Sequence, residues 1–342
     1  MTFSSRGRSE GFVLVAVIWV LAALALVAGF IAVQLESLQN QSFAMEQRRV
    51  ESMDRLAIES VILYMASTRT ATYAGLLTEP YVPGNSDIVT EHSFAARGNE
   101  IRLDGRMYPV RGDHRIRIQD AGSLVSLRND QTTKLEGLLQ SYQLPDHKVE
   151  YLISTLYDYT DRDHVSRLNG AERGEYSHAG MMPPTNRFLT NPWQLLNVIG
   201  WQEHLEKMPG FFEEVTIYVG DRENYNTMTP KAMKGFGVNV MVDVERIFEH
   251  RSERAFGRLQ EVLEVSGQIF DRDPMAVTFL PSRYLRLRIA GPGSNTERWV
   301  GVTLTPNSSL APWEIDYRVA GVTMKSEQNY VRELAAPTAL LR

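Results

Sequence analysis

A run of 23 residues from Gly11 to Val33, none of them charged, dominates the hydrophobic pattern of the chain. About 20 helical residues, each rising 1.5 Å, cross a hydrocarbon core of about 30 Å, so the run predicts a membrane-spanning helix. Arg6 and Arg8 precede the run, whereas Glu36 is the first charged residue after it. The positive-inside rule therefore predicts a single-pass protein with a cytoplasmic N-terminus and a translocated C-terminal body.

The helical pattern continues beyond the apolar run. Residues 34–67 contain neither proline nor glycine and are rich in good helix formers. We therefore expect one continuous helix from Phe12 to about Ser67. Five apolar residues recur in its second half at spacings of three and four, which predicts that this face packs against a globular head: Val50, Met53, Ala57, Val61 and Tyr64.

Alternating polar and apolar residues predict β-strands in two separate parts of the chain. Residues 100–103 and 106–110 flank Asp104-Gly105, a pattern typical of a hairpin with a two-residue turn. Alternation also predicts strands at residues 115–118, 285–289, 300–304 and 313–319. From about Asp130, between the early and the late strands, apolar residues recur with a helical period.

This order of helix, strands, helical block and strands predicts an α+β fold. The late strands need earlier strands to pair with, so we expect a long N-terminal helix on an antiparallel sheet into which a large α-helical domain is inserted. The expected segments are a leader (1–11), the transmembrane part of the helix (12–33), the first part of the α+β domain (34–120), the inserted helical domain (121–275) and the closing strands of the sheet (276–342).

Composition excludes several classes of function. With 43% hydrophobic and 23% charged residues, the chain has the composition of a folded protein. Lys and Arg number 36 against 41 Asp and Glu, and a net charge of -5 argues against nucleic acid as a partner. Cysteine is absent, which excludes thiol nucleophiles, cysteine-bound metal sites and disulfides.

The N-terminus has three interpretations. A cleaved Sec signal would have a shorter apolar region closed by an A-x-A-like site, which this sequence lacks, and a plain uncleaved anchor is the second possibility. In the third, a short polar leader ends in Gly11 directly before Phe12, with the whole apolar run after the cut. This arrangement resembles the class III signal of type IV pilins and pseudopilins, which implies that a prepilin peptidase cuts between Gly11 and Phe12.

Oxygen-bearing side chains concentrate in one short stretch, where the carboxylates of Asp158, Asp161, Asp163 and Glu172 fall within 15 residues. Such clusters suit a hard cation such as Ca²⁺, which takes six to eight oxygen ligands. The stretch is not an EF-hand, because His164 stands where that loop requires glycine. Alternatively, the three aspartates cap a helix end and solvate a loop.

This stretch and the N-terminus together resemble general secretion pathway protein K, the K family of minor pseudopilins of bacterial type II secretion. The matching residues are the D-x-x-D-x-D pattern at 158–163, the Asn-Gly-Ala-Glu run with its following Tyr at 169–176, and the Gly-Phe site at 11–12. The resemblance covers most of the chain and implies a pilin-like fold.

The resemblance implies a function in assembly rather than catalysis. The chain would form the tip of the periplasmic pseudopilus with minor pseudopilins I and J, above the H-type and major pseudopilins, and would help to initiate its assembly for the export of folded proteins. Prepilin peptidase would process it and methylation would follow, leaving the helix in the bacterial inner membrane and the body in the periplasm. Ala16 then occupies the fifth mature position, where most pilins have Glu, and a tip subunit has no neighbour above it that needs this carboxylate.

In the K family the inserted domain binds calcium. The resemblance therefore implies a structural Ca²⁺ ion, with Asp158, Asp161, Asp163 and Glu172 as its candidate ligands and no catalytic residue.

Two other functions remain open at this point. One is a minor pilin of a type IV pilus-like machine. The other is a membrane-anchored periplasmic hydrolase that uses Asp161 and Asp163, or a metal held with His164 or His178. The sequence contains no G-x-S-x-G, H-E-x-x-H or P-loop pattern to favour the hydrolase.

Overall fold

The computed structural model describes residues 10–79, 94–128, 132–220, 222–237, 241–267, 273–292 and 296–322. Residues 1–9 of the expected leader and the last 20 residues of the expected closing segment lie outside this part of the chain. The chain divides into two compact units, Met1–Ala57 and Ile58–Arg342, which are described separately.

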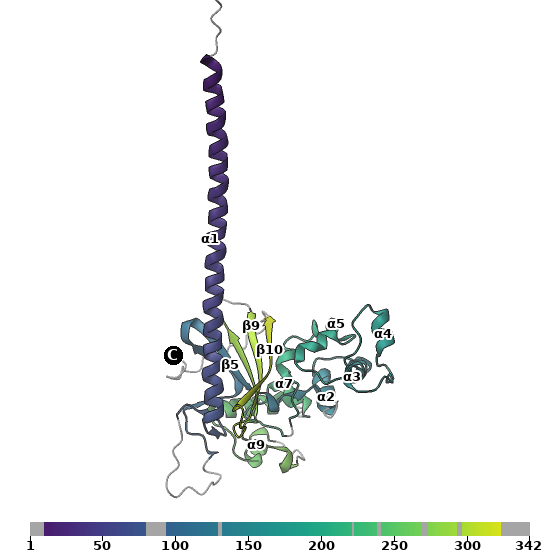
Figure 1. Ribbon diagram of the computed structural model, residues 1–342. Helices are drawn as coiled ribbons and strands as arrows, with labels where there is room; N and C mark the ends of the chain where they lie inside the picture. Colours follow the sequence, from purple (N-terminus) through teal and green to yellow (C-terminus); the bar gives the residue numbers. More distant parts are fainter. Residues whose placement is uncertain are drawn as a thin grey trace, which may run out of the picture. The chain divides into compact units, whose positions relative to one another are not determined.

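The first unit consists of a single helix throughout its described residues. Helix α1 runs from Glu10 to Thr68 without interruption, which confirms the predicted continuous helix (Figure 1). Its apolar stretch has a mean hydropathy of 2.9, and all side chains from Val13 to Val33 are exposed. In the described part of the chain, this is the one helix that is long and apolar enough to cross a membrane.

The second unit contains a five-stranded antiparallel sheet in the order β10-β9-β8-β5-β4. Figure 1 shows β5, β9 and β10 side by side. The predictions of strands at 115–118, 285–289, 300–304 and 313–319 are confirmed, because each lies in one of the observed strands: β4 (Asp104–Val110), β5 (His114–Asp120), β8 (Tyr284–Ala290), β9 (Thr296–Leu304) and β10 (Trp313–Val322).

The end of α1 packs on this sheet through a face that differs from the predicted one. Ile62 and Met65 are 1% exposed, whereas Val61 and Tyr64 of the predicted face are 41% and 58% exposed. The prediction of the packing face was wrong here. Apolar residues recur at helical spacing on two neighbouring faces, and the spacing alone does not show which face is buried. The buried face joins Leu63 and the sheet residues in one aliphatic core, which removes more apolar surface from water.

The predicted hairpin around Asp104-Gly105 was also wrong. Instead of turning there, the chain continues through both residues into β4, and the connection to β5 is the short helical turn Arg111–Asp113. Strand β3 (Glu100–Ile101) pairs with β2 (Gly75–Leu77), which in turn pairs with β1 (Ala71–Thr72). The turn therefore forms at Arg111–Asp113, where β4 pairs with β5, and not at Asp104-Gly105.

A helical region lies between β5 and β8 in the sequence. Its helices enclose a second core that includes Leu138, Leu152, Tyr176, Trp201 and Phe211. A short parallel pair, β6 (Val125–Ser126) with β7 (Val215–Thr216), also belongs to this region. The helices are α2 (Thr132–Ser141), α3 (Asp146–Thr160), α4 (Arg173–His178), α5 (Trp201–Leu205), α6 (Phe211–Glu214), α7 (Pro230–Gly235), α8 (Met241–Glu253) and α9 (Leu259–Ser266).

Buried arginines join this helical region to the sheet. Arg286 of β8 donates to the carbonyl oxygens of Phe212 and Val215 over 2.8 and 2.9 Å, and also to that of Glu213. Arg288 pairs with Glu213 and, over 2.6 Å, with Glu297. The residues from Ile58 onward form one compact unit, and the predicted limits of the insert at 121 and 275 stay predictions.

Candidate functional site

The carboxylates predicted to bind a cation lie where α3 ends. The last turn of α3 carries Asp158, which is fully buried, and the helix ends with Asp161 as its C-cap. The Asp161 N–H donates to the Tyr157 carbonyl over 2.8 Å, and the Thr160 hydroxyl donates to the Leu156 carbonyl over 2.9 Å. The helix end is therefore well defined, and the following loop starts from a fixed position.

Asp158 anchors this loop. Its Oδ2 atom accepts a hydrogen bond from the Arg167 N–H over 3.0 Å and another from the Ser166 hydroxyl over 3.4 Å. The loop passes so close that a Cβ atom on Gly170 would lie 2.0 Å from Asp158 Oδ2. Asn169 adopts the left-handed region with φ 65°. Only glycine leaves room for the anchoring carboxylate at position 170.

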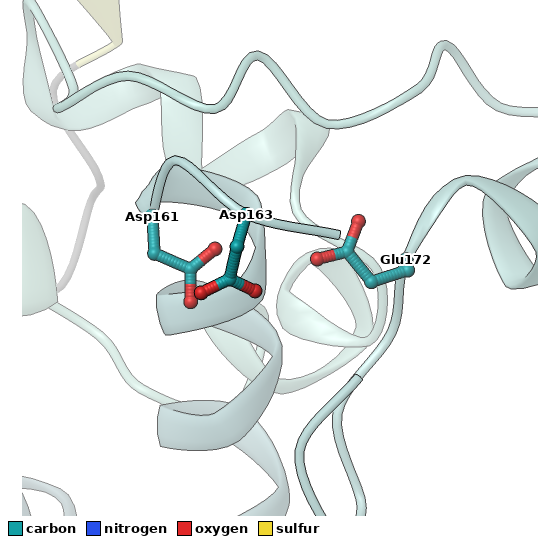
Figure 2. A group of neighbouring side chains, drawn as sticks. All are labelled: Asp161, Asp163 and Glu172. Carbon is teal, nitrogen blue, oxygen red and sulfur yellow. The ribbon is translucent and has the colours of Figure 1, made fainter. Parts of the chain in front are cut away.

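Three of the four predicted carboxylates converge beyond this anchor. Asp161, Asp163 and Glu172 each offer one oxygen atom, and these oxygens lie within 4.8 Å of one another. Figure 2 shows the Asp161 and Asp163 carboxylates at the end of the helix, with Glu172 approaching from the other end of the loop, where the next helix begins. Glu172 immediately precedes α4, so the two sides of the cluster come from the end of one helix and the start of the next.

Several oxygen atoms of this cluster are buried without a hydrogen-bond donor among the described residues. They are Oδ1 of Asp161 and both carboxylate oxygens of Glu172, whose residue is 7% exposed. A buried carboxylate without a donor carries a large desolvation cost. A bound cation would remove that cost. These carboxylate oxygens are therefore suitable ligands for a hard, oxygen-binding ion such as Ca²⁺.

The electrostatics of the cluster agree with this interpretation. Burial raises the pKa of Glu172 above its ordinary value, and the charges of Asp158 and Asp161 raise it further. Burial also raises the pKa of Asp161, reinforced by Asp163 and opposed by Arg167. The carboxylates therefore repel one another, and a divalent cation would offset this repulsion.

Other contacts hold the site in shape. The Val165 N–H donates to Asp163 Oδ1 over 2.9 Å, and the Asn186 side chain donates to the Asp163 carbonyl over 2.5 Å. Arg167 donates to both Asp158 and Asp161 through its guanidinium. Neither Asn186 nor Arg167 is among the site residues predicted from the sequence. Asn186 is distant in sequence, whereas Arg167 lies within the acidic stretch and could have been considered as its counter-ion.

The predicted cleavage site lies at the start of α1. Gly11 and Phe12 follow Glu10, the first residue of the helix, and the Phe12 side chain lies outside the described part of the chain. Cleavage between them stays a prediction.

Comparison with known proteins gives one informative finding. No family model matches the chain, and no curated protein matches it. Among solved structures, the chain is similar to one chain of "The Crystal Structure of the GspK-GspI-GspJ complex from enterotoxigenic Escherichia coli Type 2 Secretion System". The TM-score is 0.53 at 14% sequence identity, and the match covers 82% of this chain and 99% of that one. The fold is pseudopilin-like. This confirms at the level of fold the resemblance noted in the sequence.

Proposed function

We propose that this protein is a minor pseudopilin of the K type, which forms the tip of the pseudopilus in a type II secretion system. The supporting observation is the extent of the structural match, which covers 99% of a chain from a minor pseudopilin complex. A shared pilin-like helix and sheet alone would leave the helical region of this protein unmatched. The acidic stretch at 158–163 and the Asn-Gly-Ala-Glu run add sequence support at the same region.

The proposed partners are the I-type and J-type minor pseudopilins of the same organism. The solved complex contains GspK, GspI and GspJ together. In our proposal, the complex of the three initiates the fibre, the H-type and major pseudopilins extend it, and folded proteins are exported. The protein acts through assembly and not through catalysis.

The proposed location is the bacterial inner membrane, with the body in the periplasm. The apolar stretch of α1 is long enough to span the bilayer, and Arg6 and Arg8 favour the cytoplasm for the segment before it. Prepilin peptidase would cut between Gly11 and Phe12 on that side, and methylation would follow.

The proposed cofactor is a structural Ca²⁺ ion held by Asp161, Asp163 and Glu172. Bound there, it would link the end of α3 to the start of α4 and neutralise three carboxylates. Asp158 is the fourth predicted ligand, but its oxygens already accept hydrogen bonds from the loop, so we assign it the role of anchor.

The N-terminus tests the class of protein. The full-length chain is expressed with and without prepilin peptidase, extracted from membranes, and analysed by mass spectrometry. We expect a chain that starts at Phe12, is methylated, and appears only with the peptidase, while Gly11→Val stays uncut. An intact Met1 under both conditions, or cleavage beyond Val33, would contradict the proposal.

Co-purification tests the partners. We expect the processed protein to co-purify with the I-type and J-type subunits of the same organism when all three are co-expressed in membranes. If the processed protein binds neither, it is a pilin-like protein of a different machine.

Calcium binding is tested by titration of the full-length protein in detergent. We expect Glu172→Gln and Asp163→Asn to abolish binding, and a chelator to lower the unfolding temperature of the wild type by several degrees. The matched control is Glu150→Gln, because Glu150 is an exposed carboxylate on α3 outside the cluster. Equal binding by Glu172→Gln and the wild type would contradict this site.

A further inference from the structure

Arg167 is a counter-ion both of Asp158, which anchors the loop, and of Asp161, which belongs to the proposed cation site. Its Nη1 atom lies 3.2 Å from Asp158 Oδ1 and 2.6 Å from Asp161 Oδ2. The guanidinium also lies above the ring of Tyr157, with Cζ 5.4 Å from the ring centroid. A surface arginine that is 43% exposed is thus held over two carboxylates by three separate contacts.

The two oxygens of Asp161 have different surroundings. Oδ2 accepts the hydrogen bond from Arg167, whereas Oδ1 is buried without a donor and belongs to the residue that faces Asp163 and Glu172. One carboxylate is therefore shared between a guanidinium on one side and the candidate cation position on the other. Asp161 cannot give its full negative charge to a cation while it is paired with Arg167.

The backbone of the loop does not depend on the guanidinium. Asp158 Oδ2 is bound by the main-chain N–H of Arg167 and by Ser166, and Asp163 Oδ1 is bound by the main-chain N–H of Val165. Replacing the arginine side chain leaves these contacts in place. Its charge can therefore be varied without removing the hydrogen bonds that shape the loop.

We propose that Arg167 is a built-in counter-ion that sets the cation affinity of this site. With no cation bound, its positive charge offsets the negative charges of Asp158 and Asp161 and adds to the stability of the loop. With a cation bound, the guanidinium repels the ion and competes for Asp161, so affinity is lower than three free carboxylates would give. This inference rests on the proposed cation site at Asp161, Asp163 and Glu172.

The test compares Ca²⁺ binding and thermal unfolding of full-length wild type, Arg167→Gln and Arg167→Lys in detergent. We expect Arg167→Gln to bind Ca²⁺ about tenfold more tightly and to unfold at a lower temperature than the wild type when a chelator is present. Its unfolding temperature should approach that of the wild type at saturating Ca²⁺. Arg167→Lys keeps the charge and should stay within about threefold of the wild type in affinity.

Arg162 provides the matched control. It is exposed in the same loop and makes no ion pair with the four described carboxylates, so Arg162→Gln should change the affinity less than about twofold. An equal gain in affinity in Arg162→Gln and Arg167→Gln would reduce the effect to overall charge and overturn the inference.

Two outcomes separate this inference from the site on which it rests. In the first outcome, the wild type binds Ca²⁺, Glu172→Gln does not, and Arg167→Gln binds no more tightly than the wild type. The cation site is then confirmed and the proposed role of Arg167 is wrong. If neither the wild type nor Arg167→Gln binds Ca²⁺, the cation site itself is wrong and the inference falls with it.

Discussion

At the scale of residues, the buried carboxylates of the head fall into two kinds. Asp158 is satisfied by donors from its own loop, whereas Glu172 is buried with no donor among the described residues. The first kind stabilises a local fold through charge-assisted hydrogen bonds. The second kind is costly without a ligand, and it is the kind that indicates a binding site.

A substitution at Gly170 tests whether the contact of the loop with Asp158 stabilises the fold. A Cβ atom there would lie 2.0 Å from Asp158 Oδ2, whereas a Cβ atom on Gly174 would meet nothing within 4 Å. We expect Gly170→Ala to lower the free energy of unfolding by about 1–3 kcal/mol, because the loop must move away from its anchor. Gly174→Ala in α4 should instead be neutral or stabilise by up to about 1 kcal/mol. Chemical denaturation measures both, and equal effects would contradict the role of Gly170.

The buried carboxyl of Glu214 makes the stability of the folded state depend on pH. Burial raises its pKa to about 7, Glu213 reinforces this, and Thr229, Lys231 and Arg286 oppose it. The folded state thus binds more protons than the unfolded state between about pH 4.5 and 7, so this group lowers stability as pH rises through that window.

We therefore expect Glu214→Gln to gain about 2–3 kcal/mol of stability relative to the wild type between pH 4.5 and 8, because the amide carries no charge to bury. Denaturation at several pH values measures the difference, with the exposed Glu206→Gln as control. A difference that does not change with pH would show that Glu214 does not titrate in this window.

At the scale of elements, the last turns of α1 decide how the helix meets the sheet. Buried Glu59 pairs with Arg318 of β10 over 2.6 Å, beside the aliphatic contacts of Ile62 and Leu63. A charged pair at the margin of an apolar contact fixes the rotation of the helix better than apolar residues alone, since they tolerate repacking.

A matched pair of substitutions tests this face. Ile62 is 1% exposed and its neighbour Val61 is 41% exposed. We expect Ile62→Ala to cost about 2–4 kcal/mol of unfolding free energy through the lost burial and the cavity that remains. Val61→Ala should stay within about 0.5 kcal/mol of the wild type. The reverse order, measured by denaturation, would restore the face predicted from the sequence.

At the scale of the whole molecule, the helical region and the sheet meet through aromatic and polar contacts. The aromatic rings of Trp193 and Trp299 pack edge to face at 4.6 Å, and Arg288 lies 4.4 Å above the Trp299 ring. Arg286 satisfies three carbonyl oxygens at the end of α6. Directional contacts of this kind fix the orientation of the two regions relative to each other.

Arg286→Met tests this junction. The variant leaves the three carbonyls at the end of α6 without their donor, and we expect a loss of about 2–4 kcal/mol of unfolding free energy. Arg283, which immediately precedes β8, is exposed, so Arg283→Met should have little effect. Denaturation followed by tryptophan fluorescence measures the difference, and two of the five tryptophans, Trp193 and Trp299, lie in the junction. Equal stability of both variants would show that the junction does not depend on Arg286.

Local sequence patterns were sufficient to predict the helices and strands whose formation depends on residues close in sequence. The length of the apolar run predicted the long helix, alternation predicted β5, β8, β9 and β10, and helical periodicity predicted α2 and α3. The acidic stretch predicted that its carboxylates lie close together, and three of them do, because residues so near in sequence cannot lie far apart. That they bind a cation stays a proposal.

Only the tertiary structure decided between alternatives that the local sequence left equal: which face of a helix is buried, where a turn forms and which carboxylates converge. The helical period allowed two adjacent faces of α1, and contact with the sheet selected the face of Ile62. The turn predicted at Asp104-Gly105 does not form, because β3 pairs with β2 while β4 continues through these residues and pairs with β5. The same holds for the site, where the sequence named four carboxylates but the fold separated the anchor Asp158 from the converging three. Long-range packing determines burial, and burial determines which carboxylates lack donors and are therefore available to a cation.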